Sequence, residues 1–90
     1  MSIVLLFFSK SLASIMGWIG TFAYLIAYFL LSINKLKAEK KFYHLLNVVG
    51  GVGLTCNALS LNDYPNVIVN VVWAAIALGA ILLIVLRKRN

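Results

Sequence analysis

Long stretches without charge constrain this sequence more than any other feature. Three segments, at about 12–33, 42–61 and 66–86, contain no Lys, Arg, Asp or Glu. A charged side chain at the centre of a bilayer costs about 2.5–3.5 kcal/mol on insertion scales, and an apolar helix of about 20 residues crosses the hydrocarbon core. The sequence therefore predicts an all-α integral membrane protein, in which residues 1–90 form a single membrane domain of three transmembrane helices.

The composition agrees with a lipid environment. Hydrophobic residues make up 63% of the chain and charged residues only 11%, whereas soluble domains carry about 25% charged residues. A net charge of +6 could indicate a nucleic-acid partner. The basic residues, however, flank apolar segments and have no aromatic residues interleaved among them. We therefore expect the lipid bilayer as a partner and no nucleic acid.

The positions of the basic residues predict the topology. The link 34–41 and the C-terminal tail hold seven of the eight Lys and Arg residues, whereas the other side has only Lys10. Basic residues concentrate in cytoplasmic loops, so the N-terminus is expected outside and the C-terminus in the cytoplasm, with the protein in the cell (inner) membrane. Segment 3–8 has no basic residue before it, which disfavours a cleaved signal peptide; it is expected to lie at the membrane interface.

The turn at residues 62–65 is short and polar, so the second and third helices are expected to form an antiparallel hairpin. Asn62 or Asp63 can cap the third helix, and Pro65 fits its first turn, where a missing N–H costs nothing.

The sequence does not favour an enzyme. Its two carboxylates, Glu39 and Asp63, are expected on opposite sides of the membrane, and no phosphate-binding glycine loop or metal-ligand spacing is present. We expect no catalytic residues, no metal and no cofactor. Cys56 is alone and is expected to act as a small hydrophobic residue.

Polar and small residues inside the apolar segments carry the functional information. Asn70 is either a helix-to-helix contact or a solute contact in a wet cavity, because an amide within a membrane needs a partner. Trp73 lies on the same face of its helix and favours the cavity. Asn57, Tyr24 and Tyr28 are expected to line the solute route. The glycines of the three segments are expected to pack helices closely, although those of the second segment could also act as a hinge.

The stretch from Gly53 to Leu86 resembles the second half of a bacterial SemiSWEET, a three-helix half-transporter of the SWEET and PQ-loop superfamily. The resemblance rests on the turn Asp63-Tyr64-Pro65, on Asn70-Val71-Val72 after four intervening residues, and on the chain length and three spans. A looser match begins at Gly17-Trp18. The resemblance implies a bundle with helix order 1-3-2, a homodimer enclosing a solute cavity, and a solute contact at Asn70. Leu30-Leu31 replaces the family's Pro-Gln pair, and the tryptophan of its sugar clamp falls near Leu54, so sugar specificity is not carried over.

These observations favour a facilitative transporter for a small, sugar-like or otherwise polar solute, acting as a homodimer. Three helices alone offer too little wall to enclose a solute path. The alternative is a membrane scaffold or accessory subunit in which the asparagines only join helices. A proton-coupled multidrug exporter is disfavoured, because no carboxylate lies within a predicted helix.

Overall fold

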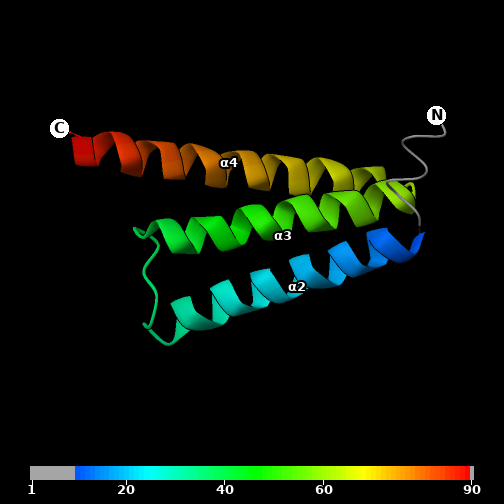
Figure 1. Cartoon of the computed structure of the whole chain (residues 1–90), viewed down its shortest axis with the longest axis horizontal. Helices are drawn as coiled ribbons and strands as arrows, with labels where there is room; N and C mark the ends of the chain where they lie inside the picture. Colours follow the sequence, from blue (N-terminus) through cyan, green and yellow to red (C-terminus); the bar gives the residue numbers. More distant parts are fainter. Residues whose placement is uncertain (1–9, 90) are drawn as a thin grey trace.

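The computed structural model describes residues 10–89, which form three helices: α2 (Lys10–Ser32), α3 (Lys41–Ser60) and α4 (Tyr64–Arg89). Each expected helix is present within three residues of its predicted bounds. Neighbouring helices run antiparallel, including the predicted hairpin of α3 and α4 (Figure 1). The expected interfacial segment 3–8 lies outside the described residues.

Two asparagines lie just after the ends of α2 and α3. Asn34 and Asn62 adopt φ angles of 61° and 56°, the left-handed conformation that Asn tolerates better than most residues and that commonly ends a helix. In the residue after Asn62, the Asp63 N–H donates a hydrogen bond to the Ala58 carbonyl at 2.9 Å. Asp63 then caps α4, because its carboxylate accepts from the backbone N–H of Asn66 at 3.5 Å. The predicted cap is confirmed.

Helix α3 lies between the other two, in a layer measuring 46 × 29 × 20 Å (Figure 1). It packs along both α2 and α4, which contact each other very little. The expected helix order 1-3-2 is therefore wrong, and the spatial order follows the sequence. The physical reason lies in α3, whose small residues face both neighbours: Gly50 and Gly53 face α2, and Gly51 faces α4.

The contacts at these glycines leave almost no space for a side chain. A Cβ on Gly20 would lie 2.7 Å from the Gly50 carbonyl oxygen, and one on Gly53 would lie 3.2 Å from the Gly20 Cα and closer still to the Met16 carbonyl oxygen. On the other face of α3, a Cβ on Gly51 would lie 2.8 Å from the Ala74 Cβ. The packing role predicted for these glycines is confirmed.

Gly79 differs from the other glycines. A Cβ there would meet nothing within 4 Å, so Gly79 packs no helix within the described part of the chain. The packing role predicted for it is not found.

The buried apolar residues of the described chain are all alanines, and no large side chain is fully buried. Most large apolar side chains are exposed instead, among them Phe22 at 56%, Phe29 at 60%, Ile68 at 65% and Leu82 at 58%. Small residues at helix contacts and large apolar residues outside are typical of helices packed in lipid.

Two of the three helices are long and apolar enough to cross a membrane: α2 over Lys10–Ser32 and α4 over Tyr64–Lys88. The expectation of three such helices is corrected by this finding, because α3 does not qualify. Its apolar character is diluted by glycines and by polar side chains such as Asn47, Thr55 and Asn57.

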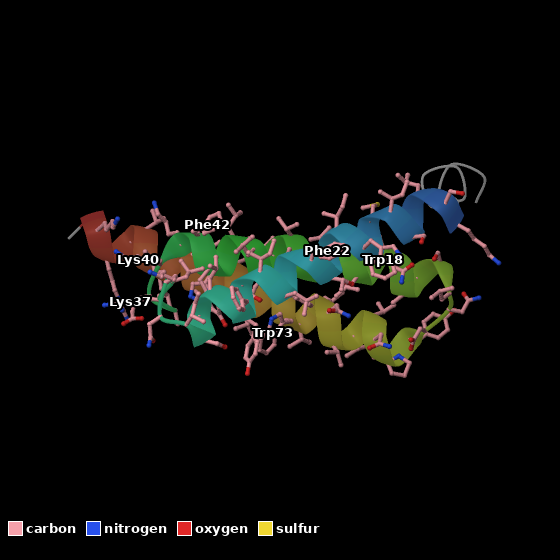
Figure 2. All side chains as sticks on the ribbon, turned by 90° about the horizontal axis from the view of Figure 1, so that it is seen from below. Trp18, Phe22, Lys37, Lys40, Phe42 and Trp73 are labelled. Carbon is pink, nitrogen blue, oxygen red and sulfur yellow. The ribbon has the colours of Figure 1, made fainter. Side chains whose placement is uncertain are left out.

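The basic residues gather at one end of the layer. The link after α2 and the last turns of α4 lie at that end, and Lys37 and Lys40 are seen there beside the end of α4 (Figure 2). Lys10 and Asp63 lie at the opposite end, at the starts of α2 and α4. The charge asymmetry read from the sequence is thus an asymmetry of the folded molecule.

Replacing Gly53 with alanine tests the close contact of α2 and α3. Gly53→Ala is expected to lower the free energy of unfolding by about 1–3 kcal/mol, the range for overpacked sites. Reversible unfolding of the purified protein in mixed micelles measures this change. Gly79→Ala is the matched control, since its Cβ meets nothing; equal losses for both variants would contradict the assigned packing.

Candidate functional site

A groove of about 270 Å³ runs between α2 and α4 over the surface of α3. Its lining residues come from all three helices and are mainly aromatic or amide side chains: Tyr24, Tyr28, Tyr43, Asn47, Val69, Asn70 and Trp73. Four of the five site residues predicted from the sequence lie in this groove, namely Tyr24, Tyr28, Asn70 and Trp73. They are brought together although α2 and α4 hardly touch.

Tyr24 forms the first polar bridge across the groove. Its ring lies directly on Gly50 of α3, so close that a Cβ on Gly50 would be 2.9 Å from the Tyr24 Cγ and nearer to other ring atoms. From there the Tyr24 hydroxyl donates to the Asn70 Oδ1 of α4 at 2.9 Å. A glycine at position 50 therefore lets a side chain of α2 reach α4 across the central helix.

Asn70 has partners for both ends of its amide. It is 8% exposed, and its Nδ2 donates to the Asn66 carbonyl one turn earlier at 2.9 Å, while its Oδ1 accepts from Tyr24. Burying an amide without partners would cost stability. The hydrogen bonds show that Asn70 joins helices, the first of the two roles considered for it.

A second bridge joins α3 and α4. The Trp73 Nε1–H donates to the Asn47 Oδ1 at 3.3 Å, and the Asn47 Nδ2 donates to the Tyr43 carbonyl at 3.1 Å. Asn47 is 7% exposed. Both bridges have the same form: an asparagine donates to its own helix and accepts from an aromatic side chain of another.

Asn47 and Tyr43 were not among the predicted site residues. The signal that could have identified them is their spacing, because residues four apart lie on one face of a helix. Tyr43 is half-buried. Its ring packs edge-on against His44, with ring centroids 5.1 Å apart.

Asn57, the fifth predicted residue, lies in a different place. It lines a second groove with Ser14, Trp18 and Thr21, and its side chain rests on Gly17, where an added Cβ would be 2.8 Å away. This second groove lies between α2 and α3, nearer the end that carries Asp63. Asn57 is absent from the groove lined by Tyr24, Tyr28 and Trp73, but it lines a further pocket together with Asn70 near the turn between α3 and α4.

The lining of the first groove contains no charged side chain. In the described part of the chain, no three His, Cys, Asp or Glu residues are grouped as metal ligands. The hydroxyls of Tyr28 and Tyr43 make no hydrogen bond with the described residues, and Tyr28 is 71% exposed. The groove thus offers aromatic rings, two unpaired hydroxyls and amide carbonyls to a ligand.

Residues 13–89 match one protein-family model, whose description carries no activity. No curated protein and no solved structure matches the sequence. The resemblance to half-transporters stays a prediction.

Removing the Tyr24 hydroxyl tests the first bridge. Tyr24→Phe is expected to lower the free energy of unfolding by about 0.5–1.5 kcal/mol, the net worth of one hydrogen bond. Equilibrium unfolding in mixed micelles measures this difference. The control is Tyr28→Phe, which removes an unpaired, exposed hydroxyl and should change stability by less than about 0.5 kcal/mol. A larger loss for Tyr28→Phe than for Tyr24→Phe would contradict the bridge.

Proposed function

We propose that this chain, which belongs to the family whose model matches residues 13–89, binds a small solute in the α2–α4 groove and passes it across a membrane as a homodimer. The observation that carries the proposal is the groove itself. Its lining brings aromatic and amide side chains from all three helices together, and pockets of this composition are where proteins bind small ligands.

In the proposed arrangement, α2 and α4 are the two helices that face the lipid. α3 lies between them, with its polar residues covered in part by its neighbours. The basic end lies in the cytoplasm, following the preference of Lys and Arg for that side. The N-terminus is then outside and the C-terminus inside the cell (inner) membrane.

A second copy would supply the missing wall of the groove. In one protomer the groove is open, because α2 and α4 hardly contact each other and no other helix among residues 10–89 covers them. A solute within a membrane needs protection from lipid on all sides, and a groove bounded by one layer of helices does not give it. Two layers facing each other would enclose a path lined by two sets of the same side chains.

Subunit counting and flux test this proposal together. Native mass spectrometry from nanodiscs should give a dimer, and proteoliposomes should take up some member of a panel of sugars, nucleosides and organic ions. Trp73→Ala should reduce that flux at least about tenfold if the groove binds the solute. Because Trp73 also bonds Asn47, the exposed Tyr28→Leu is the second variant. Flux unchanged in both folded variants would refute the groove as the solute site.

The alternative function, a membrane scaffold or accessory subunit, is favoured by one observation. The amides of Asn47 and Asn70 are both satisfied within the protomer, as side chains that only join helices would be. This function predicts that Asn70→Leu destabilises the protein without any effect on a ligand. A persistent monomer without flux would favour it over the transporter.

Cysteine labelling tests the topology. In a Cys56→Ser background, Lys37→Cys should react with a membrane-impermeant maleimide only in inverted vesicles, whereas Leu61→Cys should react in intact cells. Both side chains are exposed, with Leu61 at 61%, so access is decided by the membrane. The reverse pattern would show the opposite orientation. Labelling of both cysteine variants from one side would show that the three-helix layer does not cross the membrane.

A further inference from the structure

The hydrogen-bonding capacity of the groove is unevenly used. The Trp73 indole N–H and the Tyr24 hydroxyl proton are donated to asparagine carbonyls, and both asparagine amides donate to backbone carbonyls of their own helices. Each asparagine carbonyl has accepted one bond and keeps a second lone pair. Each asparagine amide also keeps a second N–H, and the hydroxyls of Tyr28 and Tyr43 are unpaired, so the groove retains neutral donors and acceptors but no charged donor.

This balance disfavours two classes of solute. An anion needs donors or a cation to neutralise it, and no Lys, Arg or His lines the groove. A polyol such as a sugar needs several donors and acceptors in matched positions, but the Trp73 indole N–H and the Tyr24 hydroxyl proton are already used between helices. A ligand with positive charge and no hydrogen-bond demand meets neither difficulty.

The aromatic side chains of the lining also favour a positively charged ligand. Four of its seven side chains are aromatic: Tyr24, Tyr28, Tyr43 and Trp73. The faces of such rings carry negative electrostatic potential and attract a cation within about 6 Å of the ring centre, and clusters of them recognise quaternary ammonium groups. The carbonyl oxygens of Asn47 and Asn70 add to the same negative potential.

We propose that the α2–α4 groove selects a soluble organic cation bearing a quaternary ammonium group, held by the four aromatic side chains. This inference rests on the proposed function, since it names the solute class of that same site. A groove of about 270 Å³ lies just below the range of about 300–1,000 Å³ for drug-sized ligands, which suits a small cation. The absence of a carboxylate from the lining makes the rings and carbonyls the source of attraction.

Choline and its neutral isostere 3,3-dimethylbutan-1-ol provide the test, since they share a shape and differ in charge. Binding is measured by calorimetry on the full chain in a polyoxyethylene detergent, which contains neither choline nor sugar. At about 0.15 M salt the field of the exposed lysines at the start of α3 is screened beyond about 8 Å. Choline is expected to bind at least about tenfold more tightly than the isostere.

The outcomes separate the two proposals. Equal binding of choline and the isostere, or binding of a sugar alone, would overturn the cation while leaving a solute site in the groove. No binding by any compound in the panel, together with no flux, would overturn both. Tighter binding of dihexanoylphosphatidylcholine than of choline would show that the quaternary ammonium comes from a lipid and would overturn the soluble solute.

Variants of Tyr28 distinguish the ring from its hydroxyl. Tyr28 is exposed and bonds no described residue, so its replacement leaves both bridges intact. Tyr28→Leu should weaken choline binding about tenfold, whereas Tyr28→Phe, which keeps the ring, should weaken it by less than about twofold. Tyr64→Leu is the control, because Tyr64 is 61% exposed and lies outside the groove. A loss with Tyr28→Phe equal to that with Tyr28→Leu would show recognition by the hydroxyl and overturn the cation proposal.

Discussion

The close approach of α2 and α3 at Gly20, Gly50 and Gly53 is the contact on which the rest of the structure depends. With backbones this near to each other, a tyrosine ring on α2 can lie across α3 and place its hydroxyl on α4. A single side chain at these positions would separate the helices and withdraw Tyr24 from Asn70. The groove and its bridges are therefore consequences of how α3 is built.

Much of the fold could be predicted from local sequence. Charge-free segments gave the helices, and Asn62, Asp63 and Pro65 marked the turn between α3 and α4. The helix order could not be derived in this way, because short links permit either α3 or α4 to take the central position. The order is decided by the faces on which Gly51 and Gly53 fall, and these faces become meaningful only when the neighbours are known.

The site was predictable in its chemistry but not in its pairings. Polar and aromatic residues on apolar helices indicated Tyr24, Tyr28, Asn70 and Trp73, and the structure brings these four together. Asn57 met the same criterion but lies in another groove, since sequence spacing places a residue on a face without saying which helix covers it. For the same reason Asn47 could not be recognised as the partner of Trp73.

The lack of any large, fully buried side chain in the described chain has a thermodynamic consequence. Proteins that fold in water gain a heat capacity of unfolding from apolar surface that becomes hydrated. In the proposed lipid environment the apolar surface already faces outward, and separating the helices would bring that surface no nearer to water. The stability of this layer should therefore vary almost linearly with temperature, without the curvature that produces cold denaturation.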